Sequence, residues 1–218
     1  MRRTQLAWLN LTHHRRRLAL ALAGIGFAVL LMCVELSFRQ ALFDSTVAVI
    51  RKMNAELIII SQAKYTIIVR EPFSRRRLVQ ARACQAVTGA YPLYIETKRS
   101  NLKNRQTGEA LPIRVLAFNP DDPVFNMPAI TQHLIDLRLP DRALYDEKSK
   151  KDYGPVVPGE AIELAGKRLD VIGLFSLGTD FANDGNVITS DMTFRRLFPA
   201  PSPVSSPGAT FRTAPCAR

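Results

Sequence analysis

The chain has 218 residues, of which 47% are hydrophobic, and a formal net charge of +11. Its mean hydropathy of −0.01 excludes both wholesale disorder and a membrane protein with many spans, but it is compatible with one span attached to a folded domain. A basic excess of this size is also found in nucleic-acid-binding proteins, so the position of the charges along the chain decides how the excess is interpreted.

A basic flank precedes an apolar segment at the N-terminus. Residues 1–17 carry five arginines and no acidic residue, and residues 18–34 contain neither a charge nor a proline. At about 1.5 Å per residue the apolar segment covers roughly 25 Å, and helix continuing to Phe38 would complete a crossing of about 30 Å. Because the segment is apolar on all sides, we expect a transmembrane helix, with a buried helix of a soluble protein as the alternative.

The flanking charges predict the orientation of this span. Arg15, Arg16 and Arg17 abut the apolar segment, so the positive-inside rule places the N-terminus in the cytoplasm and the long remainder across the membrane. Trp8 suits the level of the lipid head groups. A cleaved signal peptide is the rival interpretation, but the apolar segment is long for one and no small-x-small cleavage site follows it. We therefore expect an uncleaved, single-pass anchor in the inner membrane.

After Phe38 the pattern of apolar and polar residues changes to one typical of a folded α+β domain. The expected helices are 42–53, which continues from the span, 74–84 with Ser74 as the N-cap, 130–137 and 192–198. The expected strands are 56–61, 65–69, 91–97, 112–118, 160–164, 167–174 and 187–189. Strands 91–97 and 112–118 are expected to form a hairpin with a long loop, and turns are expected at 119–123 and 165–167.

The last twenty residues differ from this pattern. They contain five prolines among serine, alanine and glycine, a composition that cannot bury enough apolar surface to fold, so we expect disorder there. The expected organisation is a cytoplasmic or interfacial flank over 1–17, a transmembrane helix over 18–38, a periplasmic domain over 39–198 and a disordered tail over 199–218.

Residues that could carry catalysis or bind a metal are scattered. Cys33, Cys84 and Cys216 have neither disulfide nor zinc spacing, and the expected membrane separates His13 and His14 from His133. A phosphate-binding GxxxxGK[ST] loop is missing from the sequence. The segment from Asp180 to Asp191 faintly resembles a calcium loop, but its spacing fails the EF-hand pattern. We expect no enzyme activity, no cofactor and no metal.

Two charged segments are the candidates for docking a partner. Arg75, Arg76 and Arg77 form the densest basic cluster, which could be a solvated helix face, a contact to anionic lipid or a contact to an acidic patch on a partner. Too few aromatic residues accompany the cluster for nucleic-acid binding. The second candidate is the turn with Asn119, Asp121, Asp122 and Phe125. Its adjacent carboxylates could also pass for a catalytic or metal pair, although such pairs in turns are more often capping groups.

Several stretches of the sequence resemble one family of membrane proteins. The matching stretches are LAWLNL at 6–11, ALFDS at 41–45, MNAELIIIS at 53–61, FSRRRL at 73–78, YPLYI at 91–95, VLAFNPDDPVFNMP at 115–128, LPDRALYDEKSKKDYGPV at 139–156 and GLFSLGTDFANDGNVITSD at 173–191. Together they resemble the DevC family of ABC exporter permeases, which are related to the MacB and FtsX permeases. The likeness runs from the start of the chain to about Phe198.

The resemblance implies an inner-membrane permease subunit whose periplasmic part is a mixed α/β domain like the periplasmic core of MacB. It implies a separate ATPase subunit in the cytoplasm, a periplasmic membrane-fusion protein, an outer-membrane channel reached through that protein, and a homodimer in the complete permease. The cargo implied is a lipid, a glycolipid or another hydrophobic substrate. Permeases of this family continue into three further spans, so we expect the 218 residues to be the N-terminal portion of such a subunit, truncated before the second span.

Two functions therefore remain open at the level of the sequence. The first is a transport component that couples ATP hydrolysis by the ATPase subunit to movement of the periplasmic domain. The second is a single-span, membrane-anchored periplasmic interaction module without transport activity. An anchored hydrolase has little support, because no catalytic set of residues can be assembled.

Overall fold

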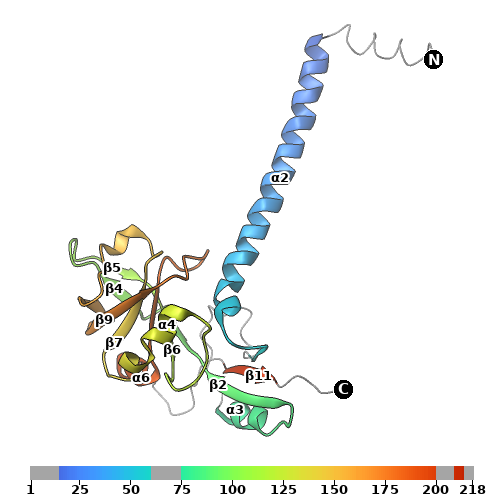
Figure 1. The fold of residues 1–218 in the computed structure, drawn as a ribbon. Coiled ribbons are helices and arrows are strands. Elements are labelled where there is room, and N and C mark those ends of the chain that lie inside the picture. The colour runs from blue at the N-terminus through green and yellow to red at the C-terminus, as the bar shows by residue number, and fades with distance from the viewer. Residues whose placement is uncertain (1–14, 60–74, 200–208, 214–218) are drawn as a thin grey trace. The chain divides into compact units, whose positions relative to one another are not determined.

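The computed structural model describes residues 15–59, 75–199 and 209–213. The contacts within the chain divide it into two compact units, Met1–Ser45 and Thr46–Arg218. Figure 1 shows the long helix α2 and the strands and short helices of the second unit. The mixed α/β architecture with one N-terminal apolar helix confirms the expected fold class.

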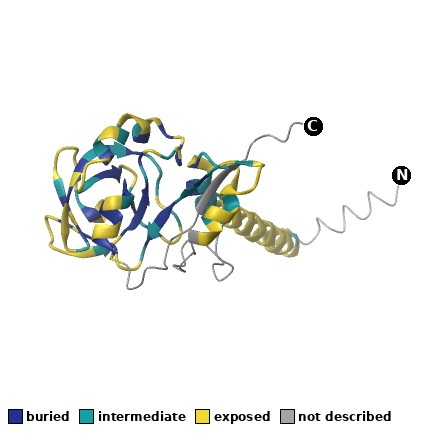
Figure 2. Ribbon diagram, turned by 90° about the horizontal axis from the view of Figure 1, so that it is seen from below, coloured by how far each residue is buried: buried dark blue, intermediate teal, exposed yellow. Residues whose placement is uncertain are grey.

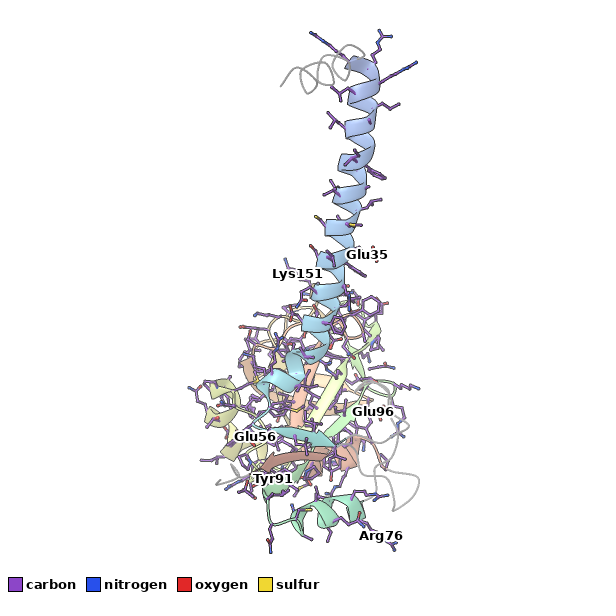
Figure 3. All side chains as sticks on the ribbon, turned by 90° about the vertical axis from the view of Figure 1, so that its right-hand side faces the viewer. Glu35, Glu56, Arg76, Tyr91, Glu96 and Lys151 are labelled. Carbon is purple, nitrogen blue, oxygen red and sulfur yellow. The ribbon has the colours of Figure 1, made fainter. Side chains whose placement is uncertain are left out.

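Helix α2 spans Arg15–Lys52 without a break. Residues Arg15–Ser45 reach a mean hydropathy of 2.3 in their most apolar window, and none of that window is buried. Apolar side chains project all around the helix (Figure 3), as expected of a helix surrounded by lipid. The expected continuation of the span at 18–38 into the helix at 42–53 is therefore confirmed, because one helix passes through Glu35 and Arg39 without interruption.

The second unit is built on an eight-stranded mixed sheet. Its strand order is β3-β6-β10-β7-β9-β8-β4-β5. In chain order the strands are β3 (Tyr94–Glu96), β4 (Asn101–Lys103), β5 (Ala110–Pro112), β6 (Arg114–Phe118), β7 (Arg142–Asp146), β8 (Ala161–Leu164), β9 (Lys167–Phe175) and β10 (Asn186–Ser190). The central pairs β6–β10 and β7–β9 are parallel, and β3–β6, β7–β10 and β8–β9 are antiparallel.

Both faces of this sheet are covered, as Figure 2 shows by the buried strands at its centre. On one face, Val115, Val187 and Leu169 pack with α6 (Asp191–Leu197) and the following Phe198. The other face packs against α4 (Pro128–Gln132) and α5 (Leu134–Leu137). Because both faces are covered, the central strands β6 and β10 are buried at every position.

A second, three-stranded sheet has the order β1-β11-β2, with β1 at Leu57–Ile59, β2 at Val87–Pro92 and β11 at Ala209–Thr213. Helix α3 (Arg75–Arg82) packs against β2. Strand β11 differs from the expectation of disorder at residues 209–213 only, which form antiparallel ladders with both β1 and β2. Residues 200–208 and 214–218 of the expected tail lie outside the described residues. The sequence of β11 reads ATFRT. This β-forming stretch is short and lies between prolines, so its signal in the sequence is weak.

Local differences from the expected elements have identifiable causes. The expected helix over 130–137 is divided at His133, whose φ of −109° and ψ of 11° leave the helical region. The His133 ring lies against β9, where a Cβ at Gly173 would be 2.5 Å from His133 Nε2. The long loop expected between 97 and 112 contains the β4–β5 hairpin, while the pairing of β3 with β6 confirms the larger hairpin.

The hairpin turn expected at 165–167 is confirmed. Ala165 and Gly166 have φ values of 51° and 73°, which is the geometry of a type I′ turn between β8 and β9. The turn expected at 119–123 is confirmed as well, with the N–H of Asp122 donating to the carbonyl of Asn119 over 2.8 Å. The strand expected at 65–69 and the N-cap expected at Ser74 lie outside the described residues.

Candidate docking surfaces

The basic cluster lies on α3, as Figure 3 shows for Arg76. Arg76 and Arg77 are exposed, and Arg77 Nη1 donates to Gln80 Oε1 over 3.2 Å on the same helix. The side chain of Arg75 lies outside what the structure describes. Arg82 instead fixes the helix to the small sheet, because its Nε and Nη2 both donate to the carbonyl of Ala90, over 3.0 and 2.7 Å.

The predicted turn divides into an exposed part and a buried part. Asn119 Oδ1 accepts the N–H of Asp121 over 3.2 Å, and exposed Asp121 forms an ion pair of 2.5 Å with Arg138. Phe125 is only 8% exposed, and its ring lies 5.4 Å from that of Phe118. The structure thus exposes Asp121 and Pro123, leaves Asn119 and Asp122 half-buried, and buries Pro120 and the Phe125 side chain.

The buried part of the turn is bonded to the end of α2. Met53 and Phe125 form an isolated antiparallel bridge. The N–H of Asn54 donates to the carbonyl of Val124 over 2.8 Å, and the N–H of Asn126 donates to the carbonyl of Lys52 over 3.0 Å. Val49, one turn earlier in α2, is buried in the same apolar cluster. The end of α2 is therefore part of the core of the second unit, through these residues.

Three exposed apolar side chains lie at the same end of the sheet as this turn. Because β6 and β10 are parallel, the turn after β6 and the start of α6 after β10 meet at one edge. Ile135, Leu139 and Met192 are 77%, 48% and 61% exposed there. Arg138, which directly precedes Leu139, forms an ion pair with Asp121 of the turn. We call this set, residues 119–123 with Ile135, Leu139 and Met192, the turn-side surface.

Acidic side chains are crowded within the turn-side surface. Burial, together with the nearby charges of Asp191 and Asp121, raises the pKa of Asp122 above its ordinary value, while the charge of Arg82 opposes the shift. The neighbouring carboxylate Asp141 is paired with Arg196 over 2.6 Å. Paired charges are neighbours of the exposed apolar side chains in the chain, since Arg138 precedes Leu139 and Asp191, paired with Arg195, precedes Met192. Exposed apolar side chains accompanied by paired charges are typical of surfaces that bind another protein.

A buried polar network lies at the opposite ends of the same strands. Arg114 at the start of β6 donates from Nε to Asn186 Oδ1 over 2.7 Å, and its guanidinium forms a buried ion pair with Asp180. Burial lowers the pKa of Arg114, and the charges of Asp180 and Asp146 oppose this shift. Asn186 Nδ2 in turn donates to Asp146 Oδ2 over 2.6 Å, so four side chains form one connected network.

This network fixes the loop between β9 and β10. The Asp146 carboxylate accepts the N–H groups of Leu177 and Gly178 over 3.1 and 2.8 Å. Asp180 Oδ1 accepts the N–H of Ala182 and Nδ2 of Asn183, each over 2.9 Å. Asp180 was expected as one end of a weak calcium-loop pattern. In the structure its carboxylate instead pairs with Arg114 and accepts hydrogen bonds that shape the turn. Nothing in the sequence pattern pointed to its partner Arg114, which lies 66 residues earlier.

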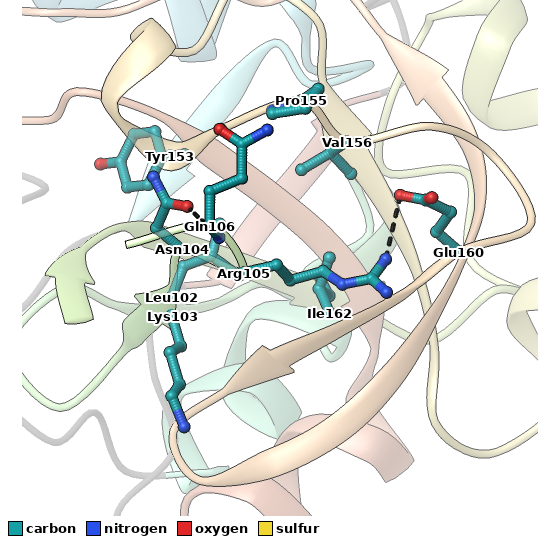
Figure 4. Close-up of a pocket in the computed structure, with 11 residues that line it drawn as sticks. Leu102, Lys103, Asn104, Arg105, Gln106, Tyr153, Pro155, Val156, Glu160 and Ile162 are labelled. Carbon is teal, nitrogen blue, oxygen red and sulfur yellow. Dashed lines mark hydrogen bonds and ion pairs between the residues drawn. The ribbon is translucent and has the colours of Figure 1, made fainter. Parts of the chain in front are cut away.

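A small cavity of about 320 Å³ lies beside strand β4 (Figure 4). Leu102, Ile162 and Val156 supply apolar lining, and Gln106 and the ion pair of Arg105 with Glu160, 3.2 Å long, lie at its rim. Asn104 shapes the adjoining turn, since its Oδ1 accepts the N–H of Gln106 over 2.8 Å. Volumes of about 300–1,000 Å³ are usual for ligand pockets, so this cavity lies at the small end of that range.

The remaining candidate residues are dispersed. Within the described part of the chain, His, Cys, Asp and Glu side chains form no group of three or more that could hold a metal ion. Cys33 and Cys84 are exposed free thiols, and Cys216 and Trp8 lie outside the described residues. Arg15, Arg16 and Arg17 are exposed at the first turn of α2.

Comparisons with known proteins give matches among solved structures alone. No family model matches the chain, and no curated protein does. The extracellular domain of the noncanonic ABC-type transporter YknZ from Gram-positive bacteria aligns at 12% identity and a TM-score of 0.45, covering 73% of this chain and 82% of that one. The periplasmic region of MacB from Actinobacillus actinomycetemcomitans aligns at 10% identity and 0.44, covering 69% and 68%. A domain assigned to a permease protein from Porphyromonas gingivalis aligns at 15% and 0.44, covering 69% and 65%.

Proposed function

We propose that this chain is the N-terminal portion of the permease subunit of an ABC-type exporter for a lipid, glycolipid or other hydrophobic cargo. Helix α2 is its membrane anchor, with the N-terminus in the cytoplasm and the second unit in the periplasm. A separate ATPase subunit supplies the energy, and a membrane-fusion protein binds the second unit. The observation that carries the proposal is the end of α2, which is built into the core of the unit it anchors.

The contacts at this end give the helix a mechanical role. Two backbone hydrogen bonds and the bridge between Met53 and Phe125 join Lys52–Asn54 to Val124–Asn126. Val49 and Met53 are 2% and 7% exposed, and close-packed interiors transmit displacements because they have little free volume. A shift of α2 along its axis therefore displaces the 119–123 turn, unless these contacts break.

The turn-side surface is the part of the second unit that would transmit this movement to the fusion protein. It contains the displaced turn and the exposed side chains of Ile135, Leu139 and Met192. Apolar side chains accompanied by ion pairs are suited to an interface that forms and dissociates, since the charged groups stay soluble when the partner leaves. The basic cluster on α3 remains a second docking candidate of the proposal.

Site-specific photo-crosslinking tests the docking surface. The full chain would be expressed in membranes with the ATPase and fusion protein of its organism, carrying a photoreactive phenylalanine analogue at Ile135 or Met192. Val157, which is 53% exposed and lies in the segment before β8, is the matched control position. We expect crosslinks to the fusion protein from positions 135 and 192 and none from 157; equal yields from all three positions would overturn the docking surface.

The same membranes separate transport from the second function, a single-span periplasmic interaction module. That alternative requires only the one candidate span found among the described residues. A transport component predicts that crosslinking yields change when the ATPase is inactivated by mutation, whereas a free-standing module predicts no change. A reporter that is active only in the cytoplasm, fused after Ser100, should be silent; activity there would refute the orientation.

A further inference from the structure

Strand β11 is the middle strand of the small sheet and connects its other two strands. It forms one antiparallel ladder with β1 and another with β2, so β1 and β2 meet through β11 rather than through each other (Figure 1). A strand of five residues forms few hydrogen bonds, and segments with few contacts open locally at little cost. A covalent contact beside β11 would therefore decide how firmly the small sheet is closed.

Cys84 lies one turn away from the paired end of β2. Its thiol is free and exposed. The N–H of Val87 donates to the carbonyl of Cys84 over 3.0 Å, and a four-residue turn keeps its first and last Cα atoms within about 7 Å. Val87 is the ladder partner of Thr213 in β11, and the Cα atoms of such partners are about 5 Å apart. The Cα of Cys84 therefore lies within about 12 Å of the Cα of Thr213.

The register of the ladder brings a second cysteine to the matching position. Cys216 follows Thr213 by three residues and Cys84 precedes Val87 by three, and the two strands are antiparallel. Cys216 itself lies outside the described residues, but three residues of extended chain reach about 10 Å. A disulfide joins Cα atoms that are about 4.4–6.8 Å apart, so the distance of about 12 Å from Thr213 can be bridged. The spacing of the cysteines in the sequence predicts no such pair.

We propose that Cys84 and Cys216 form a disulfide that fastens β11 to the small sheet. They are the two cysteines of the second unit, Thr46–Arg218. The inference rests on the proposed function in one respect, which is the placement of this unit in the periplasm, because disulfides form and persist in that compartment.

The oxidant in this step is the disulfide of a periplasmic thiol oxidoreductase. The exposed thiol of Cys84 loses its proton and attacks one sulfur of that disulfide, which forms a mixed disulfide and releases the other sulfur as a thiolate. The thiolate of Cys216 then attacks the sulfur of Cys84 and displaces the oxidoreductase. The two electrons and two protons lost by the cysteines end on the oxidoreductase, which leaves as a dithiol.

Peptide mapping of the full chain tests the pairing. Free thiols are blocked with N-ethylmaleimide in intact cells, and the protein is purified in detergent, denatured and digested with trypsin without reduction. Cleavage after lysine and arginine places Cys33, Cys84 and Cys216 on separate peptides, 18–39, 83–98 and 213–218. We expect mass spectrometry to find 83–98 linked to 213–218 in at least half of the protein, and to find the link gone after reduction.

A matched variant moves one thiol away from β11. Cys84→Ser combined with Ile135→Cys keeps the number of cysteines and places the thiol on α5, at a side chain that is 77% exposed. Oxidation of the purified proteins with glutathione disulfide should give at least a tenfold higher yield of the 84–216 link than of the 135–216 link. Phe211→Pro, which disrupts the ladders of the middle strand, should reduce the 84–216 link to the level of the control.

Equal yields of the two links, or no 84–216 link in glutathione disulfide, would overturn the proposal. A link that forms in the purified protein but not in cells would support the pairing and refute the periplasmic placement, so the two failures are distinguishable. Hydrogen exchange tests the fastening: the amides of residues 209–213 should exchange at least tenfold more slowly in the oxidised protein than in the Cys84→Ser variant. Equal exchange rates would overturn the role of the disulfide in holding β11.

Discussion

The buried ion pair between Arg114 and Asp180 gives the sharpest stability prediction. Their side chains are 5% and 8% exposed, and Asp180→Ala leaves the guanidinium of Arg114 with Asn186 as its neighbouring hydrogen-bond acceptor. Removing one member of a buried pair costs about 3–5 kcal/mol, because the other charge stays buried without its partner. Asp121→Ala removes a pair whose members are 59% and 61% exposed, which should cost at most about 1 kcal/mol.

Urea unfolding of the full chain in detergent measures this difference. The near-ultraviolet circular dichroism of Tyr94, Tyr145 and Tyr153 reports on the second unit, since all three rings are buried in one cluster. A loss of about 3–5 kcal/mol is a large fraction of the 5–15 kcal/mol typical of a domain, so the urea midpoint should fall clearly. The Asp121→Ala variant controls for loss of a carboxylate at a position of high exposure.

A double substitution distinguishes the pair from its surroundings. Arg114→Met together with Asp180→Leu removes both charges, and such replacements of buried pairs are often neutral or stabilising by about 1–4 kcal/mol. We expect the double variant to be more stable than Asp180→Ala alone. If Asp180→Ala costs no more than Asp121→Ala, or the double variant is the less stable, the reasoning from an uncompensated buried charge is refuted.

Two further predictions concern the end of α2 and the turn beside it. Met53→Ala should lower the free energy of unfolding by about 2–5 kcal/mol, because it leaves a cavity at a side chain that is 7% exposed, whereas Met192→Ala at 61% exposure should change it by no more than about 0.5 kcal/mol. Equal losses in the urea assay would contradict the placement of Met53 in the core. Asp122→Asn should stabilise the protein at neutral pH, because the folded state raises the pKa of this carboxyl by burial and by the charges of Asp191 and Asp121. A raised pKa means that the ionised form is disfavoured in the fold, so the advantage of asparagine should be absent below the ordinary pKa of 3.8 and should grow as pH rises through the raised value. Thermal midpoints measured against pH test this, and an advantage that does not change with pH would rule the explanation out.

The spacing of apolar residues along the sequence predicted much of the fold, because most helices and strands bury side chains at regular intervals. The apolar runs at β1 and β10 and the continuous helix α2 follow directly from composition. Strand β7, with the sequence RALYD, escaped prediction because it is short and has a charged residue at each end. It is nevertheless fully buried at four of its five positions, since Asp146 is satisfied by hydrogen bonds that come from a distant loop.

The candidate surfaces were predictable only in part. The turn at 119–123 has a strong local signature, but the burial of Phe125 depends on Met53, which is distant in sequence. Ile135 falls within the expected helix 130–137, yet it is 77% exposed and lies just after the point at which the chain leaves the helical conformation, at His133. The buried pair of Arg114 with Asp180 likewise escaped prediction, because the two residues are 66 positions apart in the sequence.

The parallel pairing of β6 with β10 also sets an order of events during synthesis. Arg114 and Asn186 are 72 residues apart, so at about 5–20 residues per second β6 waits roughly 4–14 s for its central partner. During that interval the sequence RVLAF, buried at every position in the finished sheet, has β3 as its early partner. Unpaired apolar strands of this kind aggregate readily. The early β3–β6 hairpin therefore protects the nascent chain before it stabilises the folded one.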